Sequence, residues 1–380
     1  MLYFIQIGFL CEYSIFITKN RLTEITGDRM QIEKKLFGTD ENGSHIYRYD
    51  VQNDSIKASF CEVGASILSV VVTDKNGIER DVVLGLDSCE AYRRNWPAFG
   101  SVIGRYANRI HKAKFEINGT VYKLKKNAPG GCLHSGYSYH YRRWDSEAFE
   151  DEMGIHVVFR LKSEDMDQGF PGNLSVEVDY VLSEDKALTI FYRYVSDKDT
   201  IVNLTNHCYF NLLGHAAGSV MNHRVCIHSG KVTQVDKQLM PTGAILDVED
   251  SAFDFRNMCT IRENQKKAFS PFCHEKEYDI NYVLAEKAGE YKEAAVLEAQ
   301  ETGIGMRVLT DMPGMQFYTG NAVNGIIGKE NVKYQKNPGV CFETQFYPDA
   351  VNQENFPSPI IKAGEEKQTK TRFEFYIVEE

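Results

Sequence analysis

Two short segments of the chain carry residues that could transfer protons. Residues 203–211 read NLTNHCYFN and contain His207, and residues 341–350 read CFETQFYPDA and contain Glu343. Polar and apolar residues alternate in both, which predicts β-strands whose successive side chains point to opposite faces. An imidazole and a carboxylate held on strands suit a general acid and a general base acting on one small molecule. Taken singly, a hydrogen-bonded structural histidine and a solvated surface glutamate are the ordinary alternatives.

The same alternation indicates which neighbours can share a site. In residues 203–211, Thr205, His207 and Tyr209 are expected on one face, with the apolar residues on the other. Cys208 is therefore expected to point into the core. Because His207 and Cys208 are expected to point to opposite faces, the histidine cannot activate this thiol as a nucleophile, although the two residues are adjacent in sequence.

Further segments supply other polar groups. Residues 100–110 contain Arg105 and Arg109 in an otherwise apolar stretch. A buried guanidinium must be paired, whereas one that lines a cleft can bind ligand oxygens with its fixed fork of donors. A glycine-rich loop presents His134, and Asp279 stands where a loop meets a predicted strand. Each of these residues, considered alone, is more typical of a structural role.

Several well-known motifs are missing from the sequence. GxGxxG, GxxxxGK[ST], HExxH and GxSxG do not occur, so nucleotide-binding, metalloprotease and serine hydrolase functions lack support. The nine cysteines include no CxxC, which indicates neither a disulfide framework nor a zinc site. Cys273-His274 has no partner pair, so no metal is expected there. This use of cysteine favours a reducing, cytoplasmic location.

Composition and charge restrict the class of partner. The 380 residues are 43% hydrophobic and 25% charged, with a formal net charge of −10. These values are typical of a globular protein with a sizeable core. An acidic surface argues against nucleic acid and anionic membranes, which attract basic proteins. A neutral or cationic small molecule remains compatible with this charge as a binding partner.

Strand signals dominate from residue 45 onward. Residues 66–73 are rich in β-branched side chains and lead through Asn76-Gly77 into 81–84, and 115–122 contain a second Asn-Gly pair. Asn-Gly between apolar runs predicts a hairpin. Further alternating sets lie at 174–182, 188–194 and 373–377. Helical periodicity is not sustained anywhere, although a short helix is expected at 89–95. The pattern predicts an all-β fold, a large antiparallel β-sandwich with few short helices.

The chain is expected to contain one domain preceded by an extension. No Pro- or Gly-rich linker divides residues 30–380, which predicts a single β-sandwich domain. Residues 1–17 are apolar but interrupted by Gln6 and Glu12, without a cleavage site, and fall short of the ~20 apolar residues of a spanning helix. We expect translation to start at Met30 and residues 1–29 to lie outside the fold. A weak membrane or partner contact is the alternative.

Together these motifs point to a known family. GRYANRI (104–110), LHSG (133–136), NLTNHCYFNL (203–212), MPGMQFYTGN (312–321) and FETQFYPDAVNQ (342–353) closely resemble those of the aldose 1-epimerases, also called galactose mutarotases. The resemblance covers roughly residues 38–380. It implies a sandwich of the galactose mutarotase type. It also implies an isomerase that interconverts the α and β anomers of free aldohexoses, such as glucose and galactose, without a cofactor or a metal.

The resemblance also assigns roles to residues. It implies Glu343 as general base and His207 as general acid. The residues implied in sugar binding are Asn108, Arg109, His134, Tyr209, Asp279 and Gln316. Two positions depart from the family pattern: Ser135 stands where glycine is usual, and Ile280 where histidine usually follows the aspartate. The second departure is expected to remove a polar side chain near the sugar hydroxyls or beside Asp279, which places substrate preference in question. The expected partner is a small aldose, and no oligomer is required.

Two other functions remain compatible with these residues. Glu343 and Asp279 could form the carboxylate pair of a glycoside hydrolase, although His207 has no place in that scheme. A sugar-binding module without catalytic activity could use the same fold, because fold does not determine function. The sequence does not identify the preferred aldose.

Overall fold

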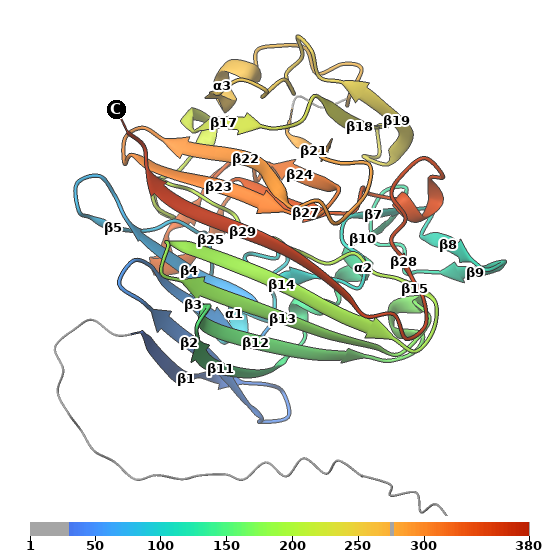
Figure 1. Cartoon of the computed structure of the whole chain (residues 1–380), viewed down its shortest axis with the longest axis horizontal. Helices are drawn as coiled ribbons and strands as arrows, with labels where there is room; N and C mark the ends of the chain where they lie inside the picture. The colour runs from blue at the N-terminus through green and yellow to red at the C-terminus, as the bar shows by residue number, and fades with distance from the viewer. Residues whose placement is uncertain (1–29, 274–276, 380) are drawn as a thin grey trace, which may run out of the picture.

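The computed structural model describes residues 30–273 and 277–379, so the expectation for residues 1–29 lies outside the described residues. The largest sheet has nine strands, all paired antiparallel. In spatial order they are β11 (Asp145–Asp151), β12 (Gly154–Ser163), β13 (Leu174–Ser183), β14 (Ala187–Ser196), β29 (Lys367–Ile377), β23 (Ile304–Thr310), β22 (Lys292–Ala299), β17 (Arg224–Ile227) and β20 (Cys259–Thr260). In Figure 1 the red C-terminal strand β29 lies between green β14 and orange β23.

Two five-stranded antiparallel sheets accompany it. One contains β1 (Gln31–Thr39), β2 (His45–Gln52), β3 (Lys57–Cys61), β4 (Ser66–Thr73) and β5 (Glu79–Asp81) in that order. The other has the order β19 (Pro241–Asp247), β18 (Lys231–Val235), β21 (Asp279–Val283), β24 (Gly314–Tyr318) and β27 (Cys341–Gln345). The prediction of an all-β, antiparallel fold is confirmed.

Short elements complete the described chain. Two-stranded ladders join β6 (Val102–Ile103) to β16 (Thr205–Asn206), β7 (Arg109–His111) to β10 (Gly131–Leu133), β8 (Lys114–Ile117) to β9 (Thr120–Lys123), β15 (Thr200–Ile201) to β28 (Ile360–Ile361), and β25 (Ile326–Ile327) to β26 (Lys333–Tyr334). The α-helices are single turns: α1 (Cys89–Tyr92), α2 (His134–Tyr137) and α3 (Ile261–Asn264). Single 3-10 turns occupy Tyr139–Tyr141, Asp167–Gly169, Val220–Asn222, Lys329–Asn331 and Ala350–Asn352. None of the helices in the described part of the chain has the length and apolar character needed to cross a bilayer.

The core lies between the nine-stranded sheet and the two smaller ones. Phe60 of β3 packs on Tyr180 of β13, with ring centroids 4.7 Å apart. On the other side, Phe342 of β27 joins the same buried cluster as Phe373 of β29. This cluster draws on residues from Tyr49 to Phe375, so elements from both ends of the chain build one apolar interior.

The two predicted hairpins are present. Asn118 and Gly119, with φ of 51° and 77°, connect β8 to β9, as a turn with two left-handed residues requires. Residues 66–73 form β4 as predicted, but its partner β5 comprises residues 79–81 rather than 81–84.

The segment around His207 differs from the predicted long strand. Only Thr205–Asn206 form a strand, paired with Val102–Ile103. The backbone N–H of His207 donates to the Ser101 carbonyl (2.9 Å), so loops rather than a regular sheet satisfy this backbone. The alternation of side chains nevertheless persists, because Cys208 is buried in the core cluster while His207 faces the opposite side. Likewise, the strand bearing Glu343 ends at Gln345 instead of residue 350.

Candidate active site

Three neighbouring strands, β21, β24 and β27, form the floor of the site. Residues directly opposite one another in antiparallel strands share a face. The register therefore places two rows on the site face: Asp279, Tyr318 and Cys341; and Asn281, Gln316 and Glu343. The opposite face carries Ile280, Phe317 and Phe342, all in the core cluster. Sheet packing thus fixes the orientation of Glu343 and Asp279.

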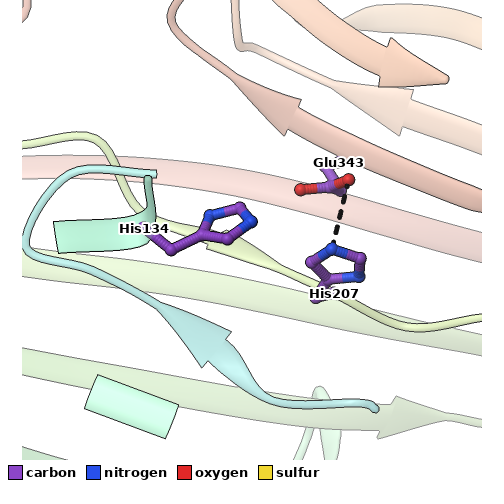
Figure 2. A group of neighbouring side chains, drawn as sticks. All are labelled: His134, His207 and Glu343. Atoms are coloured by element: carbon purple, nitrogen blue, oxygen red, sulfur yellow. Dashed lines mark ion pairs between the residues drawn. The ribbon is translucent and has the colours of Figure 1, made fainter. Parts of the chain in front are cut away.

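Glu343 and His207 face each other across this floor (Figure 2). Glu343 Oε1 lies 3.6 Å from His207 Nε2, and the two residues are only 2% and 6% exposed. Glu343 Oε2 has no hydrogen-bond partner among the described residues. Because burial disfavours the carboxylate, the pKa of Glu343 is raised well above its ordinary value, with Asp279 adding to the rise and Arg109 opposing it.

Three aromatic rings contact the imidazole of His207. It stacks on Tyr209 with ring centroids 4.9 Å apart, and the edges of Tyr318 and His134 approach it. Its second nitrogen, Nδ1, lies 3.5 Å from Cys341 Sγ. Burial lowers the pKa of His207 to about 4, although Asp279 partly opposes this effect.

The opposite pKa shifts of Glu343 and His207 have one consequence. Burial disfavours both a carboxylate and an imidazolium, so a single proton on the pair is favoured on Glu343, beside a neutral ring, over a separated ion pair. Reference pKa values near 4.3 and 6.5 would instead place that proton on the imidazole, which is the more basic group in water. A buried pair with one mobile proton can accept a proton at one atom and donate one at the other.

His134 presents a fixed donor to the site. Its Nδ1 accepts a hydrogen bond from the backbone N–H of Asn108 (3.1 Å). Burial lowers the pKa of His134 well below its ordinary value, and His207 contributes to the shift. A neutral ring that accepts at Nδ1 carries its proton at Nε2. His134 Nε2–H can therefore donate to an oxygen of a ligand.

Arg109 and Asp279 form the charged part of the site. Arg109 Nη2 lies 3.3 Å from Asp279 Oδ2, and Arg109 Nη1 donates to Asn108 Oδ1 at 3.3 Å. Gln316 Nε2 donates to the other oxygen of Asp279 at 2.5 Å. Both oxygens of Asp279 are thereby engaged and its carboxylate is held in one orientation.

A cavity of about 320 Å³ opens above these groups, within the range of small-molecule sites. Seven of the eight residues assigned from the resemblance line it: Asn108, Arg109, His134, His207, Tyr209, Asp279 and Glu343. Gln316 does not line the wall. It lies in the floor, 2% exposed, and reaches the cavity only through Asp279.

Other residues of the wall were not identified from the sequence. Trp96 lines the mouth and is 51% exposed, whereas Trp144 is fully buried. Nothing local in the sequence distinguishes these two tryptophans. Tyr318 could have been identified, because it belongs to the MPGMQFYTGN motif and its register pairs it with Asp279.

The two arginines of residues 100–110 illustrate the two roles expected of a guanidinium. Arg105 is 1% exposed and donates to the carbonyls of Pro171 (2.8 Å) and Gly172 (3.0 Å). It therefore holds loops together away from the cavity. Arg109 is the arginine that lines the cavity.

Neither departure from the family pattern reaches the cavity. Ser135 Oγ accepts from the Tyr106 backbone N–H (2.7 Å) and donates to the Tyr106 carbonyl (3.1 Å). Ile280 is 1% exposed and belongs to the core cluster. The expectation that Ile280 removes a polar group near the sugar is wrong, because its side chain leaves the opposite face of β21 from Asp279.

One donor set in the site has distances compatible with a metal. Ligand atoms of His134, His207 and Glu343 lie within 4.8 Å of one another (Figure 2). His134, however, accepts the Asn108 N–H at Nδ1, so its Nε2 carries a proton and has no lone pair for a metal. The chemistry of this donor set favours hydrogen bonding to a ligand instead.

Comparison with known proteins identifies the class that this fold and site define. Solved structures of an aldose epimerase homologue from C. elegans (TM-score 0.78, 24% identity, 92% of this chain and 100% of that chain) and a galactose 1-epimerase from Lactobacillus acidophilus NCFM (TM-score 0.79, 22% identity, 92% and 100%) share the fold. The aldose 1-epimerase family model matches residues 47–374.

Curated relatives are more similar in sequence. The chain is 35% identical over 351 residues to galactose mutarotase of Rattus norvegicus, covering 92% of this chain and 99% of that protein. It is 32% identical over 332 residues to aldose 1-epimerase of Escherichia coli (strain K12), covering 85% and 93%. The chain belongs to the aldose 1-epimerase family.

Proposed function

We propose that this protein is an aldose 1-epimerase, an isomerase that interconverts the α and β anomers of free aldohexoses such as glucose and galactose. The observation that carries the proposal is the buried pair Glu343–His207, 3.6 Å apart at the base of a small cavity. Residues far apart in the sequence meet there with opposite pKa shifts, as acid–base chemistry on one ligand requires.

The reaction needs one proton removed and one delivered. To open the pyranose, the proton shared by the pair first passes to His207; Glu343 then takes the proton of the C1 hydroxyl while His207 delivers its proton to the ring oxygen, and the C1–O5 bond breaks as the C1 carbonyl forms. Rotation about C1–C2 exposes the other face of the aldehyde. On closure the roles reverse: O5 attacks C1, His207 recovers its proton and Glu343 returns one to the C1 oxygen. The pair starts and finishes with one proton, so no cofactor enters the balance.

The remaining cavity residues would hold the sugar. Arg109 and His134 offer N–H donors, and Asp279 offers acceptor oxygens held in place by Arg109 and Gln316. Fixing the hydroxyls while C1 turns converts ring opening and closing into a reaction of one oriented substrate. Gln316 would act through Asp279 rather than by lining the cavity.

The hydrolase alternative receives no support from this geometry. Both oxygens of Asp279 already have partners, so this carboxylate is poorly placed to act as a free nucleophile or base. His207, which contacts Glu343, also has no role in a two-carboxylate mechanism.

We also expect the protein to act in the cytoplasm, and the proposed chemistry does not require an oligomer. The eight cysteines among the described residues are free thiols, which suits a reducing compartment.

Polarimetry of freshly dissolved α-D-galactose and α-D-glucose tests the proposal. Wild-type protein should accelerate mutarotation above the solvent rate, and Glu343→Gln and His207→Ala should each lower kcat by about 10²–10⁴-fold. A protein that binds galactose but leaves mutarotation at the solvent rate would instead be a non-catalytic sugar-binding module. Release of nitrophenol from aryl glycosides would indicate a hydrolase.

A further inference from the structure

Both ring nitrogens of His207 have a neighbour on the same strand. Nε2 faces Glu343 Oε1 at 3.6 Å, and Nδ1 lies 3.5 Å from Cys341 Sγ, within hydrogen-bonding distance for sulfur. Cys341 and Glu343 are two residues apart on β27, so their side chains leave the same face. One rigid strand therefore contacts the imidazole at both nitrogens.

We propose that Cys341 is a positioning residue of the mutarotation reaction, its thiol forming the hydrogen bond that orients the His207 ring through Nδ1. This inference rests on the proposed function, since it assigns His207 a proton-transfer role. Cys341 does not line the cavity, so it would act through His207.

A thiol suits this position because it can serve two states of the ring. The S–H is a weak donor and the sulfur a weak acceptor. When His207 is neutral with its proton on Nε2, the thiol donates to Nδ1. When the ring carries a proton on Nδ1, the same sulfur accepts from it by rotation of the S–H bond. The thiol can therefore pair Nδ1 in either tautomer of the ring, so this buried nitrogen keeps a partner.

The surroundings keep Cys341 in the thiol form. It is fully buried, and burial raises the pKa of the Cys341 thiol well above its ordinary value, with Glu343 adding to the rise. The thiol thus adds no charge beside His207. The titratable groups that face or act on the ring are Cys341, Glu343, His134, Tyr209, Tyr318 and, at longer range, Asp279 and His140.

The competing explanation is packing alone, because Cys341 also belongs to an apolar cluster with Leu84, Phe99 and Tyr334. Two substitutions separate the explanations. Cys341→Ser keeps a hydrogen-bonding group and loses apolar bulk, whereas Cys341→Val keeps bulk and loses the hydrogen bond. If the hydrogen bond matters, the serine variant retains activity and the valine variant loses it. Packing predicts the reverse order.

Cys61 provides a matched control. It is also fully buried on a strand, and its Sγ makes a bond of the same length, 3.5 Å, to the Val63 carbonyl. It lies in a separate apolar cluster that does not line the cavity. Cys61→Val and Cys61→Ser should therefore leave kcat unchanged. If they lower kcat, substitution of any buried cysteine reduces activity, and the loss in the Cys341 variants is not specific to His207.

The test combines polarimetry with nitrogen-15 NMR of the His207 ring, whose signals are identified by their loss in His207→Gln. We expect Cys341→Val to lower kcat about 5–10-fold with little change in KM, the effect of one hydrogen bond. Cys341→Ser should stay within about twofold of wild type. The Nδ1 and Nε2 shifts of His207 should change in Cys341→Val but not in Cys341→Ser.

Two results would overturn the inference: a valine variant with wild-type kcat and unchanged His207 shifts, or serine and valine variants with equal losses. Thermal unfolding shows whether each variant is folded. A failure of the proposed function is distinguishable, because the wild type would then not accelerate mutarotation. The NMR comparison needs no turnover, so it still reads the Cys341–His207 contact in that case.

Discussion

The most informative perturbation of this site is His207→Gln, read by stability rather than by activity. His207 is 6% exposed and its pKa is lowered to about 4 from an ordinary value near 6.5. Between these two values the unfolded chain binds a proton that the folded protein does not. The wild type therefore loses stability as pH falls through this window, and the loss is complete only below about pH 4.

The magnitude follows from the pKa difference. One pKa unit corresponds to about 1.4 kcal/mol, so lowering the pH from 7.5 to 5.0 should cost the wild type about 2 kcal/mol through His207 alone. Glutamine does not titrate and escapes this cost. The free energy of unfolding of His207→Gln should rise by about 2 kcal/mol relative to wild type over that interval, if Glu343 titrates alike in both proteins.

Urea unfolding at pH 7.5 and 5.0 measures this difference, provided that both proteins unfold with similar m-values. A Cys61→Ser variant, buried but remote from the cavity, should show no pH-dependent difference from wild type. A stability difference between His207→Gln and wild type that stays constant over the interval would refute the reasoning, since it would mean that His207 titrates normally in the folded protein.

Three further predictions concern activity. In the pH profile of kcat, activity should fall on the acid side near pH 4 rather than 6.5. Protonation of His207 adds a second proton to the Glu343–His207 pair, which then cannot accept one from the substrate. A fall of activity near pH 6.5 would contradict this prediction. Arg109→Lys should raise KM for galactose by about 10–100-fold, because an ammonium cannot replace the guanidinium donors that bond to both Asp279 and the ligand. An unchanged KM would count against this role of Arg109. Trp96→Ala should raise KM about fivefold with kcat unchanged, since covering roughly 50 Å² of apolar surface is worth about 1 kcal/mol; a fall in kcat alone would contradict this.

Local patterns predicted the parts of the fold that local physics controls. The Asn-Gly turns and the strand at residues 66–73 follow from backbone preferences, and the side-chain alternation correctly separated Cys208 from His207. The strand around His207 was predicted too long because its backbone bonds to distant loops, which periodicity cannot reveal.

The sequence motifs identified many of the residues that line the cavity, but not how these residues come together. Register between strands far apart in the sequence brings Glu343 and Asp279 to one cavity, and backbone contacts between loops bring His207 to it. Register also explains why Ile280 does not reach the cavity, since its side chain leaves the opposite face of its strand. Gln316 shares the site face but is buried beneath Asp279, to which it donates. The pKa shifts depend on burial and on three-dimensional neighbours, which the sequence does not contain.

A double-mutant cycle on Glu343 and His207 addresses the shared proton most directly. If the two side chains work as one unit, Glu343→Gln combined with His207→Gln should lower kcat for galactose mutarotation little further than either substitution alone. Losses that multiply, so that the double variant falls by the product of the two single effects, would show that the residues act independently and would contradict the central claim.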